Sequence, residues 1–346
     1  MAKNHVIKNK KPIVICPIDG KNNLLAYGTI EKIRGYGRKV QIIENEIVHF
    51  KNDEYKPVFY DSVRNLNAFV MSSSNTKPDT ELMRNCQYLQ DLRINSAGRL
   101  TSIVPYFYWA RQEKKDGKYE SISAKLHARF LEVSGMDELI TLHLHNAAIE
   151  GFFDNKPVNN PSVLQILWDR MIAYYAQLGY KFREDDFVII YPDEGIAKEC
   201  RGVSDVLNVD CDGFSKFRKE ANRIDKMKFL GGDSDSIKGK VCVVIDDQCD
   251  TGGTLEKCAS NLIARGARKV FVLITHYIGS GDAVQILQNS EIEKFFTTNS
   301  LVIPESRKFE KLDIYDLSSF FASIISTVWD GGSIRKYDWK KMLVTA

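Results

Sequence analysis

The stretch Val241-Cys-Val-Val-Ile-Asp-Asp-Gln-Cys-Asp-Thr-Gly-Gly-Thr-Leu255 joins a short apolar run, an acidic pair and a glycine-containing loop. The run from Val241 to Ile245 is apolar and mostly β-branched, which is typical of a strand covered on both faces in a parallel sheet. In open α/β sheets, ligands bind at the carboxyl ends of the strands. The side chains that follow Ile245 are therefore the first candidates for a binding site.

These following residues carry the groups that a sugar phosphate requires. Asp246 and Asp247 offer acceptors for sugar hydroxyls or for a hydrated Mg²⁺, which prefers a few carboxylate oxygens and keeps several waters. In Asp250-Thr-Gly-Gly-Thr254, two glycines let backbone N–H groups turn inward, and a helix starting near Leu255 directs its positive end to the loop. The plainer interpretation is an acidic turn before an N-capped helix. The complete pattern is more specific and favours a phosphate monoester.

This pattern resembles the phosphoribosyl diphosphate (PRPP) binding motif of phosphoribosyltransferases and PRPP synthetases. The resemblance implies that a ribose phosphate is bound by Asp246, Asp247, Asp250, Thr251, Gly252, Gly253 and Thr254. Other segments must distinguish the two families, because both use the motif.

Composition limits the class of protein. The chain has 346 residues, of which 44% are hydrophobic and 27% charged, so it is globular and long enough for two domains of ~100–200 residues. With 48 basic and 45 acidic residues, no charge footprint indicates nucleic acid or a membrane surface as a partner. Seven cysteines without CxxC spacing indicate reduced thiols and neither a disulfide nor a zinc site. Without a signal-peptide pattern or a run of ~18 apolar residues, we expect a cytoplasmic protein.

The segment Asn155-Lys-Pro-Val-Asn-Asn-Pro161 is the best candidate for a domain boundary, because it is rich in proline and asparagine. We therefore predict two domains, residues 1–158 and 159–346. The region from Pro12 to Asn67 is interpreted as short strands and turns, and later segments alternate apolar runs with helical periodicity. Together with the resemblance, this predicts two phosphoribosyltransferase-like α/β domains, each a mainly parallel sheet flanked by helices.

Two segments of the first predicted domain resemble PRPP synthetases specifically. Phe50, Asn52 and Glu54 match a family segment that holds adenine and its ribose. Arg111 and Gln112 match the Arg-Gln pair of a family motif that contacts ATP. The resemblance therefore implies ATP binding by the first domain and ribose-phosphate binding by the second.

A metal site is implied by two further matches. His145 corresponds to the histidine of the family's Asp-Leu-His, which serves Mg²⁺-ATP, and Asp193 corresponds to an acid that helps to place metal and ribose. His143 stands where the family has Asp, which removes a carboxylate near the metal. Because side chains two apart on a strand face the same way, the two histidines are also candidates to share a ligand.

The segment Phe214–Asn222 is cationic and is similar to the family's flexible catalytic loop, whose cations match Lys216 and Arg218. By itself, such a run is more typical of a charged surface. Four other positions depart from the family, and the added aromatics among them are candidates to stack on a base: Tyr191, Ile196, Glu199 in place of Arg, and Tyr277 in place of Gly.

The resemblance runs from about Phe50 to Trp329 and implies a Mg²⁺-dependent enzyme. The β,γ-pyrophosphoryl group of ATP would move to the C1 hydroxyl of ribose 5-phosphate, giving PRPP and AMP, with Lys216, Arg218 and His145 as catalytic residues. ATP and the acceptor are the implied partners, and a homo-oligomer, dimer or hexamer, is expected. Three alternatives stay open: the same chemistry on a 5′-extended ribose such as ADP-ribose, a nucleobase phosphoribosyltransferase, and a non-catalytic regulatory paralogue.

Overall fold

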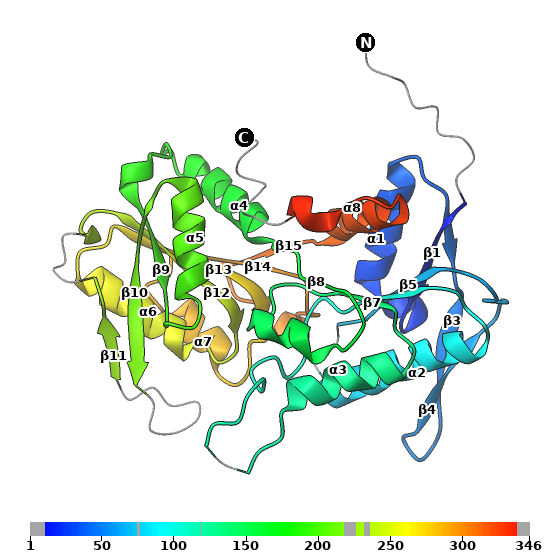
Figure 1. The fold of residues 1–346 in the computed structure, drawn as a ribbon. Helices are drawn as coiled ribbons and strands as arrows, with labels where there is room; N and C mark the ends of the chain where they lie inside the picture. The colour runs from blue at the N-terminus through cyan, green and yellow to red at the C-terminus, as the bar shows by residue number, and fades with distance from the viewer. Residues whose placement is uncertain (1–10, 75–76, 118, 218–225, 232–235, 338–346) are drawn as a thin grey trace. The chain divides into compact units, whose positions relative to one another are not determined.

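The computed structural model describes residues 11–74, 77–117, 119–217, 226–231 and 236–337 (Figure 1). The chain divides into two compact units, which are assigned as follows: residues up to Ile140, Ala148–Asn159 and Leu317–Ile334 form the first, and Thr141–Ala147, Asn160–Asp316 and residues from Arg335 form the second. This division differs from a single boundary between residues 158 and 159. Residues 141–147 belong to the second unit, although they precede the predicted boundary, and residues 317–334 belong to the first unit, although they follow it.

The first unit contains a parallel sheet in the order β2-β1-β5-β6-β7-β8 and an antiparallel β3–β4 hairpin. Its elements are β1 (Ile13–Pro17), α1 (Leu24–Gly35), β2 (Val40–Ile42), β3 (Asn45–His49), β4 (Tyr55–Phe59), β5 (Ala68–Met71), α2 (Pro78–Ile94), β6 (Leu100–Ile103), α3 (Ser123–Val133), β7 (Glu138–Ile140), β8 (Val158–Asn159) and α8 (Ser318–Trp329). Figure 1 shows α1 and α8 on one face of this sheet and α2 and α3 on the other.

Helix α1 corrects the prediction that Pro12 to Asn67 forms only short strands and turns. Asn23 caps this helix, because its side-chain oxygen accepts a hydrogen bond of 3.0 Å from the backbone N–H of Ala26. Gly28 weakens the local helix signal, since glycine is a poor helix former. In the fold, a Cβ at Gly28 would lie 2.3 Å from Oγ of Ser318, so the glycine lets α1 approach α8 closely.

The second unit contains a sheet in the order β11-β10-β9-β12-β13-β14-β15, parallel except that β11 runs antiparallel to β10. Its elements are α4 (Leu164–Gln177), β9 (Phe187–Tyr191), α5 (Ala197–Leu207), β10 (Asp210–Phe217), β11 (Lys226–Phe229), β12 (Val241–Cys249), α6 (Gly253–Ala264), β13 (Lys269–Tyr277), α7 (Ala283–Gln288), β14 (Lys294–Thr298) and β15 (Leu312–Tyr315). The predicted class, two α/β units with mainly parallel sheets flanked by helices, is confirmed.

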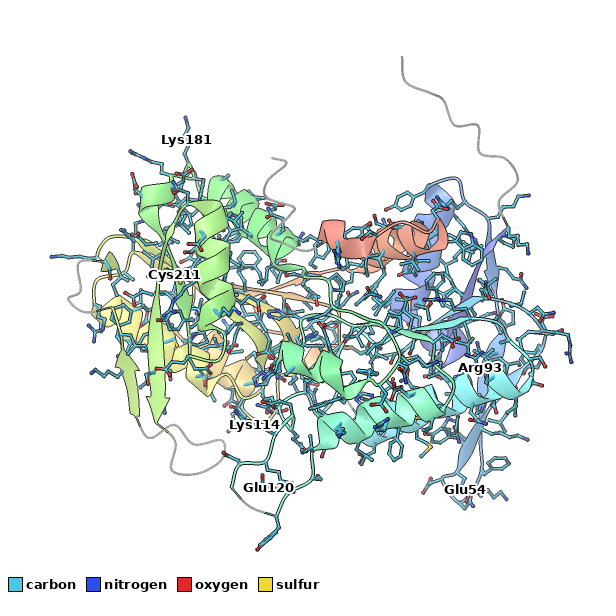
Figure 2. The ribbon with its side chains drawn as sticks, viewed as in Figure 1. Glu54, Arg93, Lys114, Glu120, Lys181 and Cys211 are labelled. Atoms are coloured by element: carbon cyan, nitrogen blue, oxygen red, sulfur yellow. The ribbon has the colours of Figure 1, made fainter. Side chains whose placement is uncertain are left out.

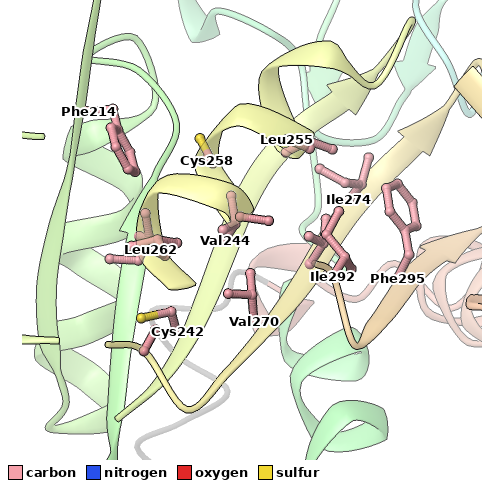
Figure 3. Close-up of a cluster of buried hydrophobic side chains, with 14 of the residues drawn as sticks. Phe214, Cys242, Val244, Leu255, Cys258, Leu262, Val270, Ile274, Ile292 and Phe295 are labelled. Atoms are coloured by element: carbon pink, nitrogen blue, oxygen red, sulfur yellow. The ribbon is translucent and has the colours of Figure 1, made fainter. Parts of the chain in front are cut away.

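Side chains pack on both faces of the sheet that contains β12. On one face, Leu255 and Leu262 of α6 belong to the same apolar cluster as Val244 of β12 (Figure 3). On the other face, Phe271 of the neighbouring strand packs edge-on against Tyr174 of α4, with ring centroids 6.1 Å apart. Full burial of each such apolar side chain contributes roughly 1.5–3 kcal/mol. The strand that leads to the acidic pair is thus firmly supported. Among the described residues, no helix is both long and apolar enough to cross a bilayer.

Candidate active site

The carboxyl ends of β9, β10, β12 and β13 meet at one edge of the second sheet, because these strands are parallel neighbours. Strand β12 continues to Cys249, beyond the apolar run, because it keeps pairing with β13 as far as Cys249 opposite Tyr277. Asp246 and Asp247 therefore belong to the end of the strand. Asp193 follows β9 at the same edge, where its Oδ1 accepts a hydrogen bond of 3.0 Å from the backbone N–H of Gly195.

The loop Asp250–Thr254 leads directly into α6, whose N-terminal end has no side-chain cap. Gly252 has φ 78°, a left-handed conformation, and a Cβ there would lie 2.9 Å from Cγ of Leu287. At Gly253, by contrast, a Cβ would meet no described atom within 4 Å. The carbonyl of Asp250 accepts a 2.9 Å hydrogen bond from the N–H of Ser280, which braces the loop from the end of β13. An uncapped helix N-terminus beside open space suits an anion.

The segment Thr141–Ala147 joins this edge through both of its histidines. Nδ1 of His145 lies 2.9 Å from Oδ2 of Asp247, and the same oxygen accepts a 3.0 Å hydrogen bond from Gln248. His143 contacts other groups: its Nδ1 shares a 2.6 Å hydrogen bond with Oγ1 of Thr275, and its Nε2 lies 3.3 Å from Oε2 of Glu199. The side chains of the two histidines therefore contact different groups, because β7 ends at Ile140 and no strand continues through them to turn both the same way.

Electrostatics reinforce this cluster. Burial opposes ionisation of Asp247, but the hydrogen bond from His145 and the charges of His145 and His143 hold its pKa well below the usual range. Burial would lower the pKa of His143, yet the carboxylate of Glu199 and the more distant Asp247 raise it above its usual value. Burial and the charge of His143 lower the pKa of His276 to about 4, so this third imidazole is neutral at pH 7.

In the sequence, His143 and Glu199 are two separate departures from the family: His143 stands in place of Asp, and Glu199 stands in place of Arg. The structure brings the two departures together, with Nε2 of His143 3.3 Å from Oε2 of Glu199. Because an acid is lost at one position and gained at the other, these two replacements were the signal in the sequence that could have indicated the pair. The sequence did not indicate Thr275 and His276 as members of the cluster, because their contacts come from segments far apart in sequence. Gln248, which is next to Asp247 in sequence, was not indicated either.

Two regions of the chain match models of known protein families. Residues 21–135 match the N-terminal domain of ribose phosphate pyrophosphokinase, and residues 224–337 match the phosphoribosyl synthetase-associated domain. The crystal structure of phosphoribosylpyrophosphate synthetase from Mycobacterium smegmatis covers 93% of this chain and 100% of its own, with 29% identity and a TM-score of 0.80. The chain belongs to the ribose-phosphate pyrophosphokinase family. It is an enzyme of the ribose-phosphate diphosphokinase type, and the predicted phosphoribosyltransferase-like fold is confirmed.

Two other solved structures are similar over smaller parts of the chain. Purine phosphoribosyltransferase from Pyrococcus horikoshii Ot3 has 17% identity and a TM-score of 0.25, covering 43% of this chain and 83% of its own. A hypothetical protein from Neisseria gonorrhoeae with bound ppGpp has 12% identity and a TM-score of 0.25, covering 48% and 92% respectively.

The two aromatic departures from the pyrophosphokinase family lie inside the fold. The Tyr191 ring lies over Gly213, where a Cβ would be 2.2 Å from Cδ2 of the tyrosine, and Arg201 lies 5.6 Å from the ring centroid. Tyr277 is 1% exposed, and its hydroxyl donates a 3.1 Å hydrogen bond to the carbonyl of Arg307. Ile196, also buried, immediately precedes α5. The idea that an added aromatic stacks on a base therefore finds no exposed ring at Tyr191 or Tyr277.

The ATP segments expected from the pyrophosphokinase family lie in the first unit. Phe50 and Glu54 close the β3–β4 hairpin through a 2.8 Å hydrogen bond from the N–H of Phe50 to the carbonyl of Glu54, and Asn52 accepts from the N–H of Glu54 at 3.3 Å. Arg111 and Gln112 are exposed in the turn after β6. Figure 2 shows Glu54 well apart from Lys114, which follows that turn. The first unit by itself does not bring the two segments together.

The predicted catalytic cations are only partly described. Lys216 lies near the end of β10, where its backbone pairs with Met227 of β11, but its side chain is outside the described residues, as is Arg218 altogether. Within the described ranges, no group of three or more His, Cys, Asp or Glu side chains is arranged to hold a metal ion.

Proposed function

We propose that this pyrophosphokinase transfers the β,γ-pyrophosphoryl group of ATP to the C1 hydroxyl of ribose 5-phosphate, giving PRPP and AMP. The observation that carries the proposal is the loop Asp250–Thr254. It presents an uncapped helix N-terminus and open space at Gly253, beside the carboxylates at the end of β12. A terminal phosphate suits the helix end, and a ribose hydroxyl suits a carboxylate acceptor.

The reaction requires positioning and charge neutralisation more than covalent chemistry. In this proposal Asp246 accepts hydrogen bonds from the ribose, and the loop binds its 5-phosphate. Asp247 orients His145, as a carboxylate bound to one ring nitrogen commonly orients a histidine toward a metal. Mg²⁺, when bound, would neutralise phosphate charge. In this proposal His145 and Asp193 would hold it. The carboxylate of Asp193 supplies the oxygen ligand that Mg²⁺ prefers, and the ion would keep several of its waters.

Matched assays of the two acceptors test this function. We expect the protein to form AMP from Mg-ATP with ribose 5-phosphate and not with ADP-ribose, with equal amounts of AMP and PRPP measured by chromatography. An ATP analogue with a methylene between the α- and β-phosphorus should give no AMP, because that bond is the one broken. If AMP forms with ADP-ribose but not with ribose 5-phosphate, ADP-ribose is the acceptor. If no AMP forms with either compound, the regulatory paralogue is favoured. Consumption of PRPP with a nucleobase would favour a phosphoribosyltransferase.

The two glycines of the loop provide a matched pair of variants. We expect Gly253→Ala to keep the wild-type melting temperature and to raise the KM for ribose 5-phosphate at least about tenfold, because its methyl group would occupy the space proposed for the phosphate. Gly252→Ala should instead lower stability by about 1–2 kcal/mol, the cost of a left-handed residue other than glycine. Thermal unfolding and steady-state kinetics separate the two effects. An unchanged KM for Gly253→Ala would contradict phosphate binding at this loop.

A further inference from the structure

The segment Thr141–Ala147 is tied to the second unit at successive residues. The carbonyl of Leu142 accepts a 3.0 Å hydrogen bond from Nε2 of His276, and the N–H of Leu144 donates one of 3.1 Å to Oδ1 of Asn160. Between these two backbone contacts, His143 turns its side chain into the unit and is only 6% exposed. The segment therefore has a defined path that ends at His145.

His143 holds an uncommon backbone conformation. Its φ is 40°, in the left-handed region, which costs a residue with a Cβ roughly 1–2 kcal/mol. Such a conformation persists only where the surroundings determine it, and it is concentrated at functional sites. The contacts available to offset this cost are the hydrogen bond with Thr275 and the approach of Nε2 to the carboxylate of Glu199 at 3.3 Å, which is an ion pair when His143 is protonated.

Glu199 comes from an element that is itself part of the candidate site. It lies in the first turn of α5, which follows the turn containing Asp193 and packs against β9 and β10. Its side chain is 30% exposed, whereas that of His143 is 4% exposed. The pair thus connects the start of α5 to the segment that carries His145.

We propose that His143 and Glu199 act together as positioning residues that fix the imidazole of His145 against Asp247. His145 has a side chain that is 37% exposed, so packing alone does not determine where its ring lies. Its placement depends on the backbone two residues earlier, which the His143–Glu199 pair holds. The inference rests on the proposed function for its kinetic effect, although the placement of the ring can be tested without activity.

The first test is a double-mutant cycle built from variants of similar shape. Glu199→Gln and His143→Asn, the latter tolerant of a left-handed φ, should each lower kcat by about tenfold to a hundredfold, as small misplacements in active sites do. The KM values for ATP and acceptor should change less than about threefold, because neither residue is proposed to contact them. The double variant should lose about as much as the worse single variant, since the two residues act as one unit.

Glu293→Gln is the matched control. Glu293 forms a 2.9 Å ion pair with Lys269 at the amino end of β13, the end of the sheet opposite the site, so this variant should retain wild-type kcat. His143→Asp combined with Glu199→Arg reverses the polarity of the pair and should recover most of the activity lost in Glu199→Gln. The proposal would be overturned if the losses of kcat in the two single variants multiply in the double variant. It would also be overturned if Glu199→Gln keeps kcat within twofold of wild type.

A second test reads the ring of His145 directly. In the proton–carbon NMR spectrum, Glu199→Gln should shift or broaden the His145 ring signal, identified with a His145→Gln variant, and leave the His49 signal unchanged. His49 lies on β3 in the first unit and serves as the internal reference. An unmoved His145 signal would overturn the positioning role. If the wild type forms no AMP with either acceptor, the proposed function fails, while this spectrum still decides the inference.

Discussion

Replacing both Lys216 and Arg218 with alanine should lower kcat by about 10³-fold or more and leave the affinity for ATP within a few-fold. Removing a single charge-stabilising donor from an active site costs about 10²–10³-fold, and removing an arginine that meets a transferring phosphoryl group costs about 10³–10⁵-fold. Strand β10 runs parallel to β9 and ends at Phe217, so this cationic stretch begins at the edge that carries Asp193 and Asp246. The cations would meet charge that develops only during transfer.

Lys228→Ala is the control for this double variant. Lys228 is an exposed cation on β11, opposite Ser215 of β10, and no role in the reaction is proposed for it. Steady-state kinetics give kcat, and calorimetry with ATP gives the binding affinity. An unchanged kcat in the double variant would contradict a transition-state role. An equal loss in Lys228→Ala would instead indicate a general effect of charge on the hairpin.

Asp247→Asn should lower kcat by about 10²-fold and leave the KM for the acceptor nearly unchanged, whereas Asp246→Asn should mainly raise that KM. The sequence assigned both carboxylates to the ribose. In the structure, Asp247 is 5% exposed and receives hydrogen bonds from His145 and Gln248. The Asn variant keeps the shape but removes the negative charge that orients His145. Asp246 is less buried, and in this proposal it accepts the hydrogen bonds from the ribose hydroxyls.

Kinetics with varied ribose 5-phosphate distinguish these two roles. Thermal unfolding of both variants should accompany the kinetics, because loss of a buried charged partner also reduces stability. His145 is partly exposed, so water can compensate part of that loss. Identical effects of the two substitutions on kcat and KM would contradict the division of labour between Asp246 and Asp247.

Local sequence was sufficient to predict those structural features that depend on only a few neighbouring residues. The apolar run at Val241–Ile245 predicted a buried strand, because burial on both faces of a parallel sheet must be met by each residue of the strand itself. The loop Asp250–Thr254 and the start of α6 were predicted for the same kind of reason, since glycine and a helix N-terminus act over a few residues. Family membership followed from several such motifs in the right order.

Only the tertiary structure decided which distant residues meet. The pairing of His143 with Glu199, the close approach of α1 to α8 at Gly28, and the enclosure of the Tyr191 ring over Gly213 all join segments that no local periodicity links. Each depends on the way the strands and helices pack after they form. A sequence pattern indicates whether a residue requires a buried, polar or turn environment. Its partner from a distant segment is determined only in the folded chain, because such segments come into contact only when the chain folds.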